Sequence, residues 1–235
     1  MIQHQLDNDI IDAVKAAKVD KVKRLLAQGA NPNAEDEKGN NALRCAILNT
    51  PRPGRQMAFA EIMEEEETGI YNPTDPDGYK KCLQALLEEG ADPDLAHPVS
   101  QRTALMEATK SCDDCAKLLL EHGANPDLQD DTGKTALMEA AHIGRGKAAK
   151  MLIESGADLH QIDENRWNAD YWAAKFNKIN IFKLIIDAKE EEREYGRIQK
   201  KVLEERKISV RRQQTHRHQN LRTYLRRPKG NNNGP

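Results

Sequence analysis

The chain has 235 residues, of which 38% are hydrophobic, 4% aromatic and 31% charged, with a formal net charge of -2. This length allows one or two domains, and the shortage of aromatic residues requires a core built from Leu, Ile, Ala and Met. No apolar stretch approaches the length of a membrane-spanning helix and no charged leader precedes an apolar run, so we expect neither a membrane span nor a secretory signal.

The expected elements are pairs of short helices, and each of the first four pairs ends in a Gly-Ala motif, followed by Asn-Pro or Asp-Pro in three copies. The copies that begin at Gly90, Gly123 and Gly156 are 33 residues apart. A unit of this length cannot hold a core of its own and must bury its apolar face against its neighbours. The period therefore predicts a solenoid of stacked helix pairs.

The first pair begins near Asp9 and ends at Gly29. The second pair is longer, because Gly29 and Gly90 are 61 residues apart, 28 more than the period. The extra residues fall between its two helices, as an insert at about 51–77. We expect a short helix at 57–67 within this insert, and both a tolerated surface insertion and a functional one stay open.

The third and fourth pairs share the hexapeptide Thr-Ala-Leu-Met-Glu-Ala, at Thr103–Ala108 and Thr135–Ala140. A Thr side chain can cap a helix N-terminus, so each hexapeptide predicts the start of a first helix. The second helices, at 115–120 and 148–153, are apolar over most of their circumference, and we expect them to be the more buried of each pair. Glycine then ends each second helix, because it readily adopts the left-handed conformation.

The fifth pair lacks this stop, because Lys189 stands where the earlier repeats have Gly. One helix is therefore expected to run from about Asn180 to beyond Gln199. Past Ser209 the chain is rich in Arg, Gln, His and Asn and poor in apolar residues, so we expect this end to be disordered.

These motifs resemble the ankyrin repeat, whose unit reads D-x-x-G-x-T-P-L-H-x-A-A-x-x-G, followed by a second helix that ends in L-L and then by G-A-D. The fourth repeat matches best, at Asp130, Gly133, Thr135, Leu137, Ala140, Ala141, Gly144, Leu152, Gly156, Ala157 and Asp158. The family's usual histidine is replaced by Met106 and Met138, so packing must substitute for its hydrogen bond to Thr.

The resemblance covers about residues 1–189, as five repeats of which the first and last look like caps. It implies an all-α ankyrin-repeat solenoid of helix-turn-helix units with hairpin or turn loops, extended by a charged C-terminal helix. Residues 190–235 are expected to form a separate charged segment, helical at first and then a disordered basic tail.

The resemblance also implies a protein-binding adaptor without catalysis, which contacts its partner through the hairpin tips and the concave side of the first helices. In register with the family, these contact positions are Glu37, Lys38, Asn40, Val99, Ser100, Arg102, Lys110, Asp131, Thr132, Lys134, His142, Ile143, Glu164, Asn165, Trp167, Lys175 and Phe176.

Ile143, Trp167 and Phe176 are of the kind that anchors interfaces. Because the last repeat of an array often covers itself, a packing role for the two aromatic residues stays open. The acidic tips at 35–37, 130–131 and 163–164 form a repeated ridge that could steer a basic partner.

Cys112 and Cys115 have the spacing of a thiol redox pair, but they lie at a helix-to-helix turn and not at a strand-to-helix turn. We therefore interpret them as structural residues. A zinc site needs a second ligand pair, and Cys45 and Cys82 lack the spacing to supply it. The sequence contains no phosphate-binding glycine loop and no hydrolase motif, so we predict no enzyme, no metal and no cofactor.

The basic tail carries the alternative function. Between Arg197 and Lys229 the sequence holds twelve Lys or Arg against two Glu, so this segment carries +10 and the remainder -12. Its arginines, with Tyr224 for stacking, would suit a nucleic acid or an anionic surface, with the repeats as the adaptor. We expect an intracellular monomer, cytoplasmic or nuclear, and delivery into a host cell as an effector stays open.

Overall fold

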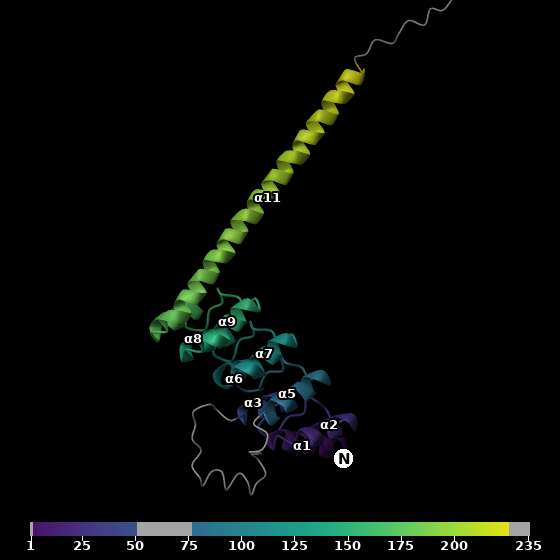
Figure 1. Ribbon diagram of the computed structural model, residues 1–235, viewed down its shortest axis with the longest axis vertical. Coiled ribbons are helices and arrows are strands. Elements are labelled where there is room, and N and C mark those ends of the chain that lie inside the picture. Colours follow the sequence, from purple (N-terminus) through teal and green to yellow (C-terminus); the bar gives the residue numbers. More distant parts are fainter. Residues whose placement is uncertain (1, 51–76, 226–235) are drawn as a thin grey trace, which may run out of the picture. The chain divides into compact units, whose positions relative to one another are not determined.

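The computed structural model describes residues 2–50 and 77–225 (Figure 1). In these ranges every regular element is a helix, and the β pairing is an isolated antiparallel bridge between Glu35 and Asn41. The chain divides into two compact units, the first ending at Ile186 and the second beginning at Asp187. The all-α prediction is confirmed, whereas nearly the whole insert, with its expected helix, lies outside the described residues.

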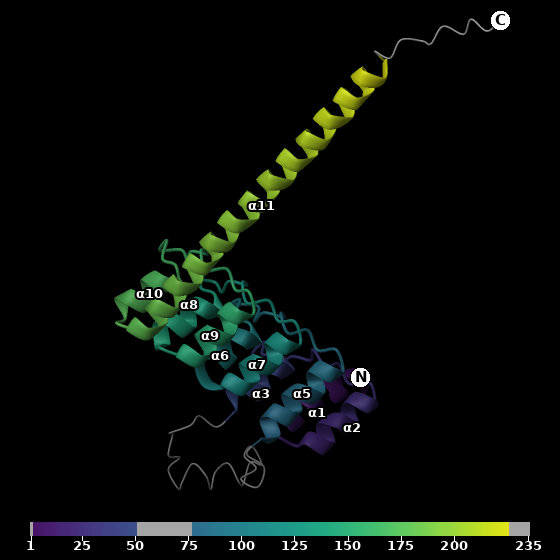
Figure 2. The same ribbon diagram turned by 45° about the horizontal axis from the view of Figure 1, so that its top comes forward.

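The described helices form five pairs that follow the repeats. They are α1 (Ile2–Lys15) with α2 (Val19–Ala27), α3 (Ala42–Leu48) with α5 (Gly78–Glu88), α6 (Ala104–Ser111) with α7 (Asp113–Glu121), α8 (Ala136–Ile143) with α9 (Gly146–Glu154), and α10 (Ala169–Lys175) with α11 (Ile179–Leu225). In the first unit the first helices contact one another in the order α1, α3, α6, α8 and α10, and α2, α5, α7 and α9 form a second row beside them (Figure 2). Each repeat thus buries its apolar side against its neighbours.

The predicted helix starts and stops of repeats three and four are confirmed. Thr103 accepts a hydrogen bond from the Met106 N–H at 3.4 Å, and Thr135 caps α8 in the same way. Gly123 and Gly156 have φ of 84° and 83°. A Cβ at either glycine would meet nothing within 4 Å, so the left-handed backbone, and not a lack of space, requires glycine there.

Side chains of the Gly-Ala motif also connect successive repeats. Asp94 Oδ1 accepts a hydrogen bond from the Asn125 N–H at 2.7 Å, and Asp127 Oδ1 accepts one from the Asp158 N–H at 2.8 Å. A third bond of this kind joins repeats one and two. The motif therefore ends a helix and also fixes the spacing between neighbouring repeats.

The prediction that second helices are the more buried of each pair is wrong. The first helix α6 buries six of its eight residues, from Ala104 to Thr109, whereas α7 buries three of its nine. The pair α8 and α9 shows the same difference. A first helix lies between the first helices of two neighbouring repeats and against its own partner, and its small Ala residues allow this close approach. The second helices keep one charged side in water.

Helix α11 continues without a break from Ile179 to Leu225, which confirms that the helix runs on through Lys189. It also continues past Ser209, where the sequence analysis expects disorder. No Gly or Pro interrupts the chain between Arg197 and Leu225, and its Arg and Gln residues are good helix formers. The expected domain boundary after Lys189 stays a prediction. None of the described helices combines the length and apolar composition needed to cross a membrane.

Candidate partner-binding surface

The predicted contact residues lie on the hairpin loops and first helices of repeats two to five, and all seventeen keep some exposure to solvent. Val99, at a loop tip, is 79% exposed. Several of the others, however, make internal bonds that limit what they can offer to a partner. Their use by a partner stays a prediction.

The hairpin loops that precede α3, α8 and α10 are each closed by an aspartate that the sequence analysis places on the acidic ridge. Asp130 Oδ1 accepts hydrogen bonds from the Thr132 and Lys134 N–H groups, both at 3.0 Å. In their own loops, Asp163 Oδ1 and Asp36 Oδ1 likewise accept hydrogen bonds from the N–H groups that lie two and four residues further along the chain. Asp130 and Asp163 are 7% and 4% exposed. These carboxylates stabilise the loops and are not available to steer a partner.

Asp36 is also paired with Lys15, whose Nζ lies 3.0 Å from its Oδ2. Burial by itself raises the pKa of the Asp36 carboxyl, but the hydrogen bonds from Asn40 and Lys15 outweigh it and hold this pKa below its ordinary value. The acidic residues of the ridge that remain exposed and could steer a partner are Glu35, Glu37, Asp131 and Glu164.

Arg102 lies at the centre of an ion-pair network on the first helices. Its Nε is 2.6 Å from Glu107 Oε1, and its Nη1 is 2.9 Å from Asp130 Oδ2. Its Nη2 lies 3.6 Å from Glu139, which also pairs with Lys110 at 3.2 Å. The Arg102 side chain is only 16% exposed. We therefore place it as a residue that joins repeats three and four, although the sequence analysis has it as a contact residue.

Arg44, which the sequence analysis does not single out, joins the same network from α3. Its Nη2 lies 3.7 Å from Glu107 Oε1, and its Nη1 donates to the Arg102 carbonyl at 3.1 Å. Burial raises the pKa of Glu107, but the Arg102 guanidinium outweighs this and holds it below its ordinary value. The carboxylate is therefore charged and fully engaged inside the protein.

One period further along the chain, the same surface changes from charged to aromatic. Trp172 on α10 occupies the position that Glu139 has on α8, and Phe176 occupies the position of Ile143. Phe176 is among the contact residues expected from the sequence and Trp172 is not, although the repeat register places both on this surface.

Five rings form what we call the aromatic cluster: His142, Trp167, Tyr171, Trp172 and Phe176. Trp172 is at its centre, 5% exposed, with its indole N–H donating to Asp163 Oδ2 at 3.1 Å. Phe176 stacks on it with ring centroids 5.5 Å apart, and Trp167 meets it edge to face at 5.1 Å. Trp172 therefore packs between repeats four and five, and its neighbours lie further out.

The outer members of the cluster remain accessible. Tyr171 is 47% exposed, Phe176 40% and the adjacent Ile143 39%. The packing role that the sequence analysis leaves open for Trp167 and Phe176 thus falls mainly to Trp172, and Phe176 still presents a ring to solvent.

Two lysines lie over the faces of the tryptophans. Lys134 Nζ is 4.1 Å from the centroid of the Trp172 ring, and Lys175 Nζ is 3.4 Å from that of Trp167. Such cation–π contacts fix the ammonium groups beside the rings. Burial, and next the charge of Lys134, lower the pKa of His142, so this ring is neutral at neutral pH. The surface therefore combines exposed aromatic carbon with fixed positive charge.

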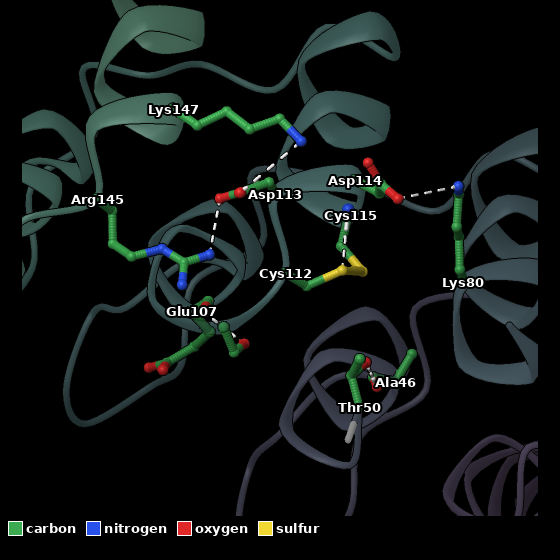
Figure 3. The surroundings of a disulfide bond; sticks show 11 residues. Ala46, Thr50, Lys80, Glu107, Cys112, Asp113, Asp114, Cys115, Arg145 and Lys147 are labelled. Atoms are coloured by element: carbon green, nitrogen blue, oxygen red, sulfur yellow. Dashed lines mark hydrogen bonds and ion pairs between the residues drawn. A yellow bond between two sulfur atoms is a disulfide. The ribbon is translucent and has the colours of Figure 1, made fainter. Parts of the chain in front are cut away.

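The two cysteines that have redox spacing form a disulfide, Cys112–Cys115, at the turn between α6 and α7 (Figure 3). Their interpretation from the sequence, as structural residues, does not include this bond. The other two cysteines, Cys45 and Cys82, are buried thiols. Within residues 2–50 and 77–225 no group of three or more His, Cys, Asp or Glu side chains could hold a metal ion.

A family model described as ankyrin repeats (3 copies) matches residues 76–163 and 126–197, which together span just over half of the chain. The match runs from the second helix of repeat two into α11. A comparison with curated proteins gives no match for the chain.

Proposed function

Because the chain belongs to the ankyrin repeat family, we propose that it is a non-catalytic adaptor that binds a partner protein on the concave side of its first helices and on its hairpin tips. Ankyrin repeats are generally modules of protein–protein interaction. Stacked repeats offer a rigid, extended surface, which lowers the ordering cost of association.

The observation that carries this proposal is the aromatic cluster on repeats four and five. Aromatic side chains that are held in place by packing and still exposed are the usual anchors of an interface. Phe176 meets this description, because the buried Trp172 fixes its ring while 40% of the residue remains exposed. The neighbouring Ile143 and Tyr171 enlarge the apolar area around it.

The charges around the cluster favour one kind of partner. Among the described residues no carboxylate pairs with Lys134 or Lys175, whereas Lys110 is paired with Glu107 and Glu139. A partner segment that places an acidic side chain beside an apolar one would match this surface. The repeat surface is thus proposed to bind an acidic, apolar segment, although the overall charge of the repeats is negative.

A capture experiment tests the proposal. The immobilised wild-type chain and the double variant Ile143→Ala/Phe176→Ala are incubated with the same cell extract, and the bound proteins are compared by quantitative mass spectrometry. The matched control is Lys117→Ala/Lys150→Ala, on the second helices, where the two side chains are 64% and 65% exposed. The proposal requires a partner that the control retains and the cluster variant loses. Equal retention by both variants would contradict it.

We also propose that the chain acts as a monomer inside the cell, in the cytoplasm or nucleus. Its buried thiols Cys45 and Cys82 support a reducing compartment. Gel filtration with light scattering tests the monomer, and a fluorescent fusion tests the location.

A further inference from the structure

We propose that Cys112 and Cys115 form a reversible thiol–disulfide site, which is reduced by thiols such as glutathione and oxidised by their disulfides. The inference does not depend on the partner-binding surface. It rests on the turn between α6 and α7, on the unequal exposure of the two cysteines, and on the charges beside them.

The α6–α7 turn differs from the corresponding turns of the other repeats. Helix α6 ends at Ser111 and α7 begins at Asp113, so Cys112 is the single residue between them. The turns of repeats one, four and five each contain a left-handed residue, at Ala17, Gly144 and Asn177. Cys112 is instead extended, with φ of -142° and ψ of 95°. Repeat three therefore closes this turn by a different device.

That device is the sulfur of Cys112, which caps α7. Cys112 Sγ accepts a hydrogen bond from the Cys115 N–H at 3.1 Å. The residues at the same position before α2 and α9, Lys18 and Arg145, make no side-chain cap bond. A helix N-terminus favours negative charge, so this position stabilises Cys112 as a thiolate once the disulfide opens.

The charged groups around the turn compensate its two acidic residues. Arg145 Nη2 lies 2.7 Å from Asp113 Oδ1, and Lys147 Nζ lies 3.9 Å from Asp113 Oδ2. On the other side, Lys80 of α5 pairs with Asp114 at 3.5 Å (Figure 3). Three cations thus face two carboxylates, so Asp113 and Asp114 do not cancel the effect of the helix N-terminus on the Cys112 sulfur.

The two sulfurs have unequal access to solvent. Cys112 is partly exposed, whereas Cys115 is buried at 1% exposure. An external thiolate can therefore attack Cys112 without unfolding the repeat. The pair also closes a loop of only four residues, Cys112 to Cys115. A crosslink this short restricts the unfolded chain less than a long one does, so stabilising the fold is a weak reason for the bond to exist.

The exchange follows from this geometry. A thiolate attacks Cys112 Sγ, the bond to Cys115 breaks, and Cys115 leaves as a thiolate that takes up a proton. The thiolate of a second reductant molecule then attacks the sulfur that the first reductant contributed to the mixed disulfide. This attack releases Cys112 as a thiolate at the N-terminus of α7. The reductant ends as its disulfide, and the pair has gained two electrons and, after protonation, two protons.

The test begins with the wild-type chain, folded and equilibrated in a series of reduced and oxidised glutathione mixtures. Accessible thiols are blocked with iodoacetamide, and each cysteine is then assigned by peptide mass spectrometry. Cys45 and Cys82 serve as internal controls, because both are buried and burial raises the pKa of Cys45 to about 12. We expect Cys112 labelling to rise as the mixture becomes more reducing, while Cys45 stays unlabelled. A pair that is fully bonded, or fully reduced, in every mixture would overturn the proposal.

Two variants separate the roles of the two sulfurs. Cys115→Ala keeps the capping sulfur, and Cys112→Ser replaces it by another good cap. With oxidised glutathione, Cys112 in the first variant should form a mixed disulfide at least about tenfold faster than Cys115 in the second. Equal rates in two variants with unchanged circular dichroism would contradict the assigned roles. The wild-type titration stays decisive if either variant does not fold.

Discussion

Trp172 and Phe176 stack almost parallel, with an interplanar angle of 8° and ring centroids 5.5 Å apart. The two residues nevertheless have different roles, since Trp172 is 5% exposed and Phe176 40%. One ring belongs to the core between repeats four and five, and the other continues it to the surface. Phe176 can therefore be changed on the candidate surface while Trp172, which supports it, stays in place.

Truncating Phe176 should weaken binding more than folding. We expect Phe176→Ala to reduce partner affinity by about 1–3 kcal/mol, because the ring is a fixed, exposed anchor. Its cost in stability should be about 1 kcal/mol or less, since nearly half of the residue is already in solvent. Isothermal titration calorimetry and urea unfolding measure the two effects. A stability loss larger than the affinity loss would assign Phe176 to packing.

Truncating Trp172 should do the opposite. Trp172→Ala removes a buried ring and the hydrogen bond from its indole to Asp163, so we expect a loss of about 3–5 kcal/mol in the free energy of unfolding. Tyr171→Ala, at an exposed position of the same helix, is the control and should cost about 1 kcal/mol or less. If both variants unfold at the same urea concentration, Trp172 is not part of the core between repeats four and five.

Arg102 should matter for stability and little for binding. Arg102→Met leaves the buried carboxylates of Glu107 and Asp130 without their main partner, and the loss should be about 3–5 kcal/mol. Lys110→Met, whose side chain is 29% exposed, should cost about 1 kcal/mol or less. Thermal unfolding of both variants checks this. A larger effect for Lys110 would mean that Arg102 is not the centre of the network.

Asp36 gives a pH dependence of known sign. Its pKa is lower in the folded chain than in the unfolded chain, so its charge stabilises the fold above the unfolded pKa, and this contribution is lost as pH falls through the folded pKa. Asp36→Asn keeps an oxygen that can accept the loop N–H bonds but removes the charge. Urea unfolding should show wild type more stable near neutral pH, with the difference shrinking below about pH 4. A constant difference would exclude the charge as its cause.

Local motifs are sufficient to predict the repeats. The side-chain contacts between repeats could not be predicted, because no local motif marks them. Thr103 and Gly123 act on their own helix ends, so their roles were readable from a few neighbouring residues. The sequence does not show that Arg102 bridges repeats three and four, because its partners Glu107, Asp130 and Glu139 come from different loops and helices. Trp172 was missed because no short motif marks it. Only its alignment with Glu139, one period earlier, shows that it lies on the same surface.

The cysteine pair shows the same limit. Its spacing was visible, but the one-residue turn that brings the Cys112 sulfur to the N-terminus of α7 depends on where α6 ends. Helix boundaries are hard to read from sequence at that resolution.

The most direct test of the account is site-specific photocrosslinking. A photoreactive phenylalanine derivative is placed in turn at Phe176 on the candidate surface, at Lys117 on α7, and at Tyr224 in the basic tail, and each chain is irradiated in cell extract. The account predicts a discrete protein adduct from position 176, none from 117, and an unchanged adduct when excess nucleic acid is added. An adduct only from position 224 that nucleic acid or salt abolishes would contradict it, and would make the basic tail the binding element.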